Sequence, residues 1–299
     1  MAIRWPEKIR EFQSSHFDST VWNDYEFRDD DIVIGTYAKS GTTWTQQIVS
    51  QLIFSGEEGL NVGEMSPWID LRVPPKDEKL AALEAQTHRR FVKTHLPVDA
   101  LLFSPKVKYI YIARDGRDVL WSMYNHHVNA NEEFYKLLNE TPGLVGPPMP
   151  RCTQPVLEYF REWLEKDGYP WWSLWENIRT WWEIRELPNV MLIHFQNLRN
   201  DLSSEMRAIS DFLDIQIDES RWDTLVEHCT FDYMKKNAEL VAPLGGSVWE
   251  GGGKTFINKG TNGRWRDTLT EEDVANYERA AIEQLGEDCA HWLTTGEML

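Results

Sequence analysis

Four short runs of apolar residues alternate along the chain with longer segments of helical periodicity. The apolar runs are rich in Ile, Val, Tyr and Phe, which is typical of strands covered on both faces. They lie at residues 31–35, 90–93, 106–113 and 189–195. Helical patterns follow the first, third and fourth runs, at residues 42–54, 115–127 and 201–213. Repeated strand–helix units predict an α/β fold with a central parallel sheet flanked by helices.

Three further segments carry many Pro and Gly residues and lack strong periodicity, at 61–76, 139–153 and 237–255. Long loops in a compact domain are usually functional lids or disordered segments. In an open parallel sheet, ligands bind beyond the carboxyl ends of the strands, where such loops gather. Neither a linker nor an internal repeat divides the sequence, so we expect a single domain over residues 1–299.

The chain contains 15 Trp residues, several of them clustered between positions 171 and 182. Leu174, Ile178, Trp181 and Trp182 fall at helical spacing. We therefore interpret the clustered tryptophans, Trp171 and Trp172 included, as packing on a helix face, in preference to an aromatic pocket for a ligand.

The formal net charge of −17 disfavours nucleic acid as a partner, because an acidic protein repels a phosphate backbone. An anionic ligand would need positive charge concentrated in a local pocket. The three cysteines, Cys152, Cys229 and Cys289, are widely spaced and predict neither a disulfide framework nor a zinc site. The N-terminal residues lack the apolar run of a signal peptide, and no run of about 18 apolar residues indicates membrane insertion. A cytoplasmic location is expected.

The first predicted strand runs into a loop that combines glycine, lysine and hydroxyl residues, and then into a helix. The loop and the first helical turn hold Gly35, Lys39, Ser40, Gly41, Thr42 and Thr43. In such a turn, backbone N–H groups and the helix N-terminus face an anion, and the lysine adds charge. We interpret the segment as a P-loop-like phosphate cradle, in preference to an ordinary strand-to-helix turn with a threonine cap.

This loop differs from a Walker A motif, which places its lysine directly after its second glycine. Here Lys39 comes two residues before Gly41. After the third predicted strand, the candidate carboxylate for magnesium, Asp115, follows Arg114. Both features disfavour an ATP-dependent P-loop kinase or phosphotransferase. That class is one alternative, and a non-catalytic nucleotide-binding protein of the same fold is the other.

The segment YAKSGTTW resembles the phosphosulfate loop of the cytosolic sulfotransferase family, with Ala38 where that family usually has proline. The resemblance continues through KTHLP at 93–97, YIARDGRD at 111–118 and FINKG at 256–260, in the same order over roughly residues 30–270. It implies PAPS (3′-phosphoadenosine-5′-phosphosulfate) as the donor, PAP as the product and no metal. The family resemblance also implies a parallel sheet of about five strands.

Sulfuryl transfer needs cations at the leaving phosphate and a base for the acceptor hydroxyl. In the context KTHLP, His95 is the candidate base, since histidine accepts a proton near neutral pH. Lys39 is expected to stabilise the bridging oxygen. Lys93 precedes His95 by two residues and so points to the same face of an extended strand. The resemblance implies that Lys93 assists at the sulfuryl group.

The remaining donor contacts also follow from the resemblance. Ser40, Gly41, Thr42 and Thr43 are expected to bind the 5′-phosphosulfate. Arg114 and Ser122, about two helical turns apart, are expected to hold the 3′-phosphate. The alternative for Arg114 is a surface ion pair with Asp115 or Asp118.

On the adenine side, we expect the rings of Trp44 and Phe231 to sandwich the base, because aromatic faces stack on bases. Phe195 stands where many relatives have tyrosine, and Asn258 where they commonly have arginine; Arg264 replaces an acid and adds positive charge. The other residues assigned to the donor by resemblance are Thr230, Met234, Phe256, Lys259 and Gly260.

Together these features predict a sulfotransferase that acts on a hydroxyl of a small, apolar or aromatic acceptor. Phenols, alcohols, sterol-like compounds and lipids all fit. Pro67, Trp68, Phe134 and Trp249 are the expected apolar walls of the acceptor pocket. A short dimer motif of many relatives is not recognisable at 266–274, so the sequence leaves monomer and dimer both open.

Overall fold

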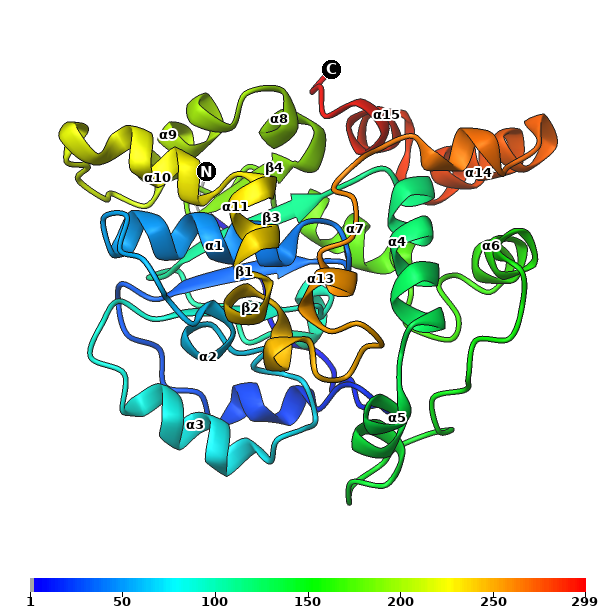
Figure 1. The fold of residues 1–299 in the computed structure, drawn as a ribbon, viewed down its shortest axis with the longest axis horizontal. Helices are drawn as coiled ribbons and strands as arrows, with labels where there is room; N and C mark the ends of the chain where they lie inside the picture. The colour runs from blue at the N-terminus through cyan, green and yellow to red at the C-terminus, as the bar shows by residue number, and fades with distance from the viewer. Residues whose placement is uncertain (1–2) are drawn as a thin grey trace.

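A computed structural model describes residues 3–299 and places a parallel sheet at the centre of the molecule (Figure 1). Its strands pair in the order β2-β1-β3-β4. Their bounds are β1 (Ile32–Thr36), β2 (Phe91–Thr94), β3 (Lys108–Ala113) and β4 (Val190–His194). The predicted α/β fold and parallel sheet are confirmed, and each strand coincides with one of the four apolar runs, although β1 and β2 each extend one residue beyond it.

The expectation of about five strands is wrong, because the sheet has four. Beyond β2, residues around Trp68 approach the sheet edge and form only an isolated bridge with Lys93. The Lys93 N–H donates to the Pro67 carbonyl at 3.0 Å, and the Ile69 N–H donates to the Lys93 carbonyl at 3.1 Å, but proline has no N–H with which to continue the ladder past this bridge. The segment therefore covers the edge without extending the ladder.

The helices predicted from periodicity are confirmed as α1 (Thr42–Ile53), α4 (Gly116–Val128) and α9 (Leu202–Phe212). The short helix α8 (Phe195–Asn200) joins β4 to α9. The other helices are α2 (Val62–Met65), α3 (Lys76–Glu84), α5 (Glu132–Asn139), α6 (Val156–Glu165), α7 (Leu174–Glu183), α10 (Trp222–His228), α11 (Phe231–Lys236), α12 (Ala238–Val241), α13 (Gly253–Phe256), α14 (Glu271–Leu285) and α15 (Glu287–Thr295). The 3₁₀ turns are η1 (Ser19–Asn23), η2 (Val98–Ala100), η3 (Glu219–Arg221), η4 (Pro243–Gly246) and η5 (Arg264–Asp267).

Two hydrophobic cores cover the two faces of the sheet, because successive strand side chains point to opposite faces. Ile32 and Ile34 pack with residues of α1, α9 and α10. Val33 of the same strand packs on the other face, with residues of α4, α6 and α7. In Figure 1, α1 and α10 accordingly lie on one side of the strands and α4 and α6 on the other. The sheet is thus buried on both faces, as its apolar runs predict.

A buried ion pair fixes the beginnings of β1 and β2. Arg90 donates to both carboxylate oxygens of Asp31 at 2.9 and 2.6 Å, and the side chains are only 2% and 0% exposed. The Tyr25 hydroxyl donates to the same carboxylate at 2.8 Å. Because buried charges need such partners, this cluster holds the start of β1 beside the start of β2, where Ile32 pairs with Phe91.

Helix α7 packs closely against β1. A Cβ at Gly35 would lie 2.4 Å from the Trp181 ring, so only glycine allows this approach. Trp175 and Trp181 are buried in the core, which agrees with their interpretation as helix packing. Within residues 3–299, the structure has no helix long and apolar enough to cross a membrane.

Candidate active site

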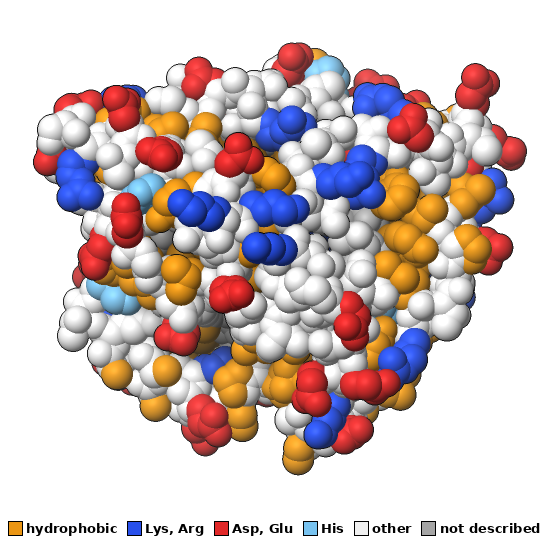
Figure 2. Space-filling model, viewed as in Figure 1, with side chains coloured by type: hydrophobic (Ala, Val, Ile, Leu, Met, Phe, Trp, Pro, Cys, Tyr) orange, Lys and Arg blue, Asp and Glu red, His pale blue; other side chains and the backbone are white. Residues whose placement is uncertain are grey.

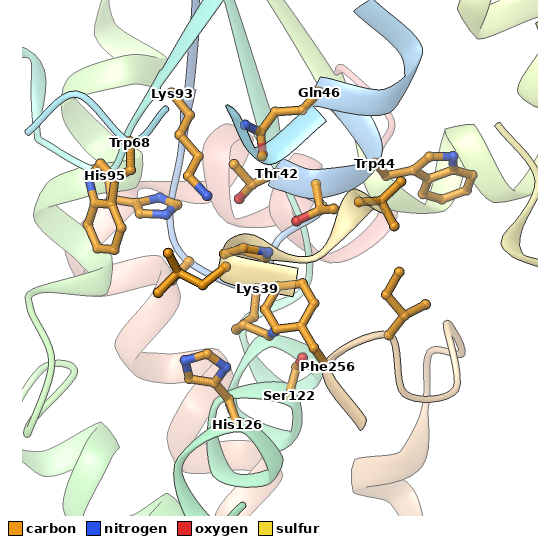
Figure 3. Close-up of a pocket in the computed structure, with 18 of the residues that line it drawn as sticks. Lys39, Thr42, Trp44, Gln46, Trp68, Lys93, His95, Ser122, His126 and Phe256 are labelled. Carbon is orange, nitrogen blue, oxygen red and sulfur yellow. The ribbon is translucent and has the colours of Figure 1, made fainter. Parts of the chain in front are cut away.

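A single large cavity of about 1070 Å³ opens beyond the carboxyl ends of the strands, where ligands of open parallel sheets bind. Residues from His16 to Arg264 line it. Figure 3 shows Lys39 near its middle, Trp68 and His95 on one side and Trp44 on the other. We call the Trp68 side the acceptor half and the Trp44 side the nucleotide half.

The loop between β1 and α1 has the geometry of an anion cradle. Lys39 has a φ of 65° and Gly41 a φ of 121°, so the backbone turns sharply before α1 begins. Gly41 offers no side-chain cap to α1, and the first turn carries no acidic residue. The N-terminal N–H groups and the positive end of the helix dipole are thus left for a ligand.

The structure brings most of the predicted loop residues to the cavity. Lys39, Gly41, Thr42 and Thr43 line it, but Ser40 does not. Ser40 is buried, and its N–H donates to the carbonyl of Tyr37 at 3.3 Å. Ser40 therefore stabilises the turn and does not line the cavity.

Two lysines converge on the middle of the cavity (Figure 3). Lys39 Nζ lies 3.8 Å from the centre of the Phe256 ring, and Lys93 Nζ lies 5.9 Å from the Trp68 ring. Burial, reinforced by Lys93 and Arg114, lowers the pKa of Lys39 to about 7. Burial also lowers the pKa of Lys93 to about 8. A bound anion would stabilise both ammonium groups.

His95 is held in a defined tautomer. Its Nδ1 lies 2.7 Å from the carbonyl oxygen of Thr36, which can only accept, so Nδ1 carries the proton. Nε2 is then left with a free lone pair. Burial, with smaller effects from Lys93 and Lys39, lowers the pKa of His95 to about 3, so the ring is neutral in the empty cavity. The ring packs against Trp68 at 4.5 Å and Trp172 at 5.6 Å between ring centres.

Helix α7 positions the backbone on either side of this histidine. Asn177 donates from Nδ2 to the carbonyl of His95 at 2.9 Å, and Trp181 donates to the carbonyl of Leu96 at 3.1 Å. Asn177 Oδ1 in turn accepts from the Tyr111 hydroxyl at 2.9 Å. Each of these groups is buried and hydrogen-bonded, which fixes the direction of the His95 ring.

In the nucleotide half, Arg114 is buried and forms no ion pair with a described residue. It donates to Asn262 Oδ1 at 2.8 Å and to the Thr261 carbonyl at 2.9 Å, and its guanidinium stacks 4.3 Å from the Phe195 ring. Burial lowers its pKa to about 10, so it stays charged at neutral pH. The alternative of a surface ion pair with Asp115 or Asp118 is not observed. Asp115 pairs with Arg117, and Asp118 accepts a hydrogen bond from the Gly263 N–H at 2.7 Å.

Arg264 lies beside Asn258. Its guanidinium donates to Asn258 Oδ1 at 3.3 Å, and both residues line the cavity. Asn258 Nδ2 also donates to Asn125 at 3.3 Å, while the Asn258 carbonyl accepts from Lys235. The positive charge of Arg264 thus lies next to the Asn258 side chain, where relatives commonly have an arginine.

The remaining predicted donor residues all line the cavity. They are Trp44, Ser122, Phe195, Thr230, Phe231, Met234, Phe256, Lys259 and Gly260. Trp44 is anchored by a 2.7 Å hydrogen bond to the carbonyl of Cys229 and meets Phe195 edge-on at 5.3 Å. Trp44 and Phe231 form no ring contact among the described residues.

The acceptor half is walled by aromatic rings. The predicted walls Pro67, Trp68, Phe134 and Trp249 all line it. Trp171 and Trp172 also face the cavity, although Trp172 is part of the core as well. The interpretation of these two tryptophans as packing alone is therefore incomplete, because they precede α7 and do not follow its buried face.

Among the polar cavity residues that sequence reasoning missed are His16, His126 and Arg199. His16 and His126 reach the acceptor half from segments that carry no recognisable motif. Arg199 lies in α8, and the only feature of the sequence that points to it is its position shortly after the fourth strand. Within residues 3–299, no group of three His, Cys, Asp or Glu residues is arranged to hold a metal ion.

The charge of the cavity is opposite to that of the whole chain. Its lining includes seven lysines and arginines but only three acidic residues. Figure 2 shows Lys and Arg side chains gathered over α11 and α13, with acidic side chains scattered around them. Positive charge is thus concentrated at one place, as an anionic ligand requires.

A family model described as sulfotransferase domain matches residues 29–288. The glycolipid sulfotransferase of Mycobacterium bovis (strain BCG / Pasteur 1173P2) is 31% identical over 95% of this chain and 94% of its own length.

Two solved structures share the fold. Mouse sulfotransferase SULT7A1 complexed with PAP has a TM-score of 0.71 and 22% identity, over 92% of each chain. Retinol dehydratase in complex with androsterone and inactive cofactor PAP has a TM-score of 0.69 and 24% identity, over 90% of this chain and 84% of its own.

The depressed pKa of Lys39 predicts a pH-dependent stability difference between the ligand-free protein and Lys39→Met. The native pKa of about 7 lies below the ordinary value of 10.5. Native Lys39 therefore loses its proton at a lower pH than unfolded Lys39, and the wild type gains stability as pH rises between those values. Urea unfolding should show Lys39→Met gaining most over wild type below about pH 7, with that gain shrinking toward pH 10.

The exposed Lys106, with 68% of its side chain accessible, supplies the control Lys106→Met. Its stability difference from wild type should stay nearly constant over the same range. A constant difference for Lys39→Met as well would show that Lys39 is not buried as a costly cation.

Proposed function

This chain belongs to the sulfotransferase family, and on that premise we propose that it transfers the sulfuryl group of PAPS to a hydroxyl on a largely apolar acceptor, with His95 as the general base. The observation that carries the proposal is the convergence of Lys39, Lys93 and a neutral His95 in one cavity. We also propose that residues 1–299 act as one domain, since the lining runs from His16 to Arg264.

The proposed reaction is a single displacement. The acceptor oxygen attacks sulfur while the bond between sulfur and the 5′-phosphate oxygen breaks, and PAP leaves. The acceptor proton passes to Nε2 of His95, whose Nδ1–H is already held by Thr36. Negative charge grows on the leaving oxygen, where Lys39 and the N-terminus of α1 are available to stabilise it.

The pKa of His95, about 3 in the empty cavity, is compatible with this role. Burial and the neighbouring lysines keep the imidazole unprotonated, so it is ready to accept a proton. The negative charges of a bound donor would offset Lys93 and Lys39, and would raise the pKa of His95 as the reaction begins. Lys93, beside Trp68, is assigned to the sulfuryl oxygens.

For the nucleotide, we assign the 5′-phosphosulfate to Lys39, Thr42, Thr43 and the turn that Ser40 and Gly41 shape. Arg114 and Ser122 are assigned to the 3′-phosphate. Relatives commonly have an arginine where this chain has Asn258, and we assign the role of that arginine to Arg264. The adenine is assigned to the space between Trp44 and Phe231. The preformed contacts of Arg114 with Asn262 and Phe195 hold its guanidinium in place before the ligand arrives.

The acceptor half favours a compound with a hydrophobic body, because its walls are mostly indole and phenyl rings. The relative from Mycobacterium bovis is named for glycolipid sulfation, and the retinol dehydratase structure contains androsterone. Both names fit an apolar acceptor with a hydroxyl, which is the class that we propose.

Replacing His95 should abolish transfer while leaving PAP binding nearly intact, because proton removal depends on the imidazole and the phosphate contacts do not. Initial rates with radiolabelled PAPS and an alcohol and phenol library should fall about 10²–10⁴-fold in His95→Gln and His95→Ala. His95→Gln fills most of the same volume between Trp68 and Trp172 and so guards against a packing artefact.

Lys39→Ala provides the contrast, since its charge meets both the bound donor and the developing charge. It should weaken PAP binding and turnover together. A His95→Gln enzyme with more than about a tenth of wild-type activity would remove His95 as the base.

Arg264→Gln should weaken PAP binding by about tenfold, the scale of one charge-assisted hydrogen bond. AMP, which lacks the 3′-phosphate, should bind the variant and the wild type equally. Titration calorimetry with both ligands checks this. An equal loss for AMP and PAP would place Arg264 away from the 3′-phosphate.

A further inference from the structure

Buried polar atoms without partners are concentrated in one place. Within residues 3–299, nine buried side-chain nitrogen or oxygen atoms have no hydrogen-bond partner, and six of them belong to cavity-lining residues. These residues are His16, Gln86, Trp121, His126, Trp172 and Trp249. Such atoms are rare in folded proteins because each costs free energy, so the region around the cavity is the part of the described structure where polar partners are most often missing.

His126 is the clearest of these residues. It reaches from α4 into the cavity (Figure 3), between the rings of Trp249 at 4.8 Å and Trp171 at 5.6 Å. Neither of its ring nitrogens forms a hydrogen bond with a described residue, and Nδ1 is fully buried. An aromatic wall alone would be built at lower cost with phenylalanine, which has no polar atom to satisfy.

The next residue shows what a structural histidine looks like in this helix. His127 pairs both ring nitrogens, with the Tyr159 hydroxyl at 3.3 Å and the Pro150 carbonyl at 2.7 Å. It does not line the cavity. The protein therefore satisfies one histidine of this pair internally and leaves the other facing the empty acceptor half.

His16 approaches the same space from the N-terminal segment. Its Nδ1 pairs with the Ser15 hydroxyl at 3.1 Å, while Nε2 is buried without a partner. Its ring lies 5.2 Å from Trp171 and 5.7 Å from Trp172. Because Trp172 also packs against His95 and Trp171 also packs against His126, His16 lies between the aromatic walls of the proposed base and those of His126.

Both histidines are neutral in the empty cavity. Burial lowers the pKa of His16 to about 3, and burial together with Lys39 lowers the pKa of His126 well below its usual range. A neutral imidazole offers one donor and one acceptor, so it matches a hydroxyl, which can use both.

We propose that His126, together with His16, binds a second hydroxyl of the acceptor, so that the acceptor class is a diol or polyol on an apolar body. One hydroxyl lies at His95 and is sulfated, and the other is held by the two histidines and is not. This rests on the proposed function and specifies its substrate. It also predicts regioselectivity, since the histidine contacts decide which hydroxyl reaches His95.

The test compares matched acceptors that differ by one hydroxyl: naphthol against the dihydroxynaphthalene isomers, and long-chain alcohols against the corresponding diols of several lengths. The flexible diols allow the second hydroxyl to reach the histidines whatever its distance from the first. At least one diol should exceed its mono-alcohol in kcat/KM by about tenfold or more, because a site built to pair a hydroxyl rejects an analogue that lacks it. Calorimetry in the presence of PAP should show the same preference in binding.

The variants assign the preference to the histidines. His126→Phe and His16→Phe should each reduce the diol preference toward one, because kcat/KM should fall more for the diol than for the mono-alcohol. His126→Gln keeps a donor and an acceptor and should retain part of the preference. The matched control His127→Phe should lower the melting temperature, because it breaks two internal hydrogen bonds, but it should leave the preference unchanged.

The outcomes separate this inference from the proposed function. No transfer from labelled PAPS to any acceptor, with no PAP binding, would overturn both. Transfer with equal kcat/KM for every diol and mono-alcohol would overturn the inference alone. A His126→Phe enzyme that loses activity equally with both acceptor types would also overturn it, because the histidine would then serve the reaction itself.

Discussion

Two lysines buried without ion pairs are the constraint on which the rest of the site depends. Lys39 follows β1 and Lys93 lies in β2. Among the described residues neither ammonium group forms an ion pair; each lies near an aromatic ring, and the more distant Asp70 offsets only part of the cost at Lys93. Burial of an unpaired cation costs free energy, which the depressed pKa values of both groups express. An anionic donor removes this cost. The cavity is therefore organised for an anion, and the strand ladder between β1 and β2 keeps the two cations together.

The same constraint explains how an acidic protein binds an anionic nucleotide. The chain carries a net charge of −17, yet most charged residues in the cavity lining are basic. Local charge at short range decides binding in a buried site, whereas the distant acidic side chains are screened by salt. His95 takes part in this arrangement as a neutral group, because burial, and after it the charge of Lys93, lowers the pKa of its ring.

Sequence reasoning located the parts of the fold and site that are encoded in contiguous segments. Apolar runs located the strands, and periodicity located α1, α4 and α9, because each reports local burial. The loop around Lys39 and the segment at His95 were recognisable as motifs, and the structure brings both to one cavity. The sheet edge was mispredicted, because the proline at 67 limits pairing in a way that the family resemblance does not report. Trp171 was interpreted as helix packing, and His16 and His126 were not predicted at all. Whether these side chains point into the cavity depends on packing between segments that are distant in the sequence.

The most direct test of the account is the thermal stability of the purified protein with PAP in the presence of a magnesium chelator, compared with ATP and magnesium. Ligand binding to the native state alone should stabilise it by about 2.7 kcal/mol at a hundredfold excess over Kd. The account predicts a clear rise in melting temperature with PAP that does not need magnesium. A rise only with ATP and magnesium, and none with PAP at millimolar concentration, would contradict it.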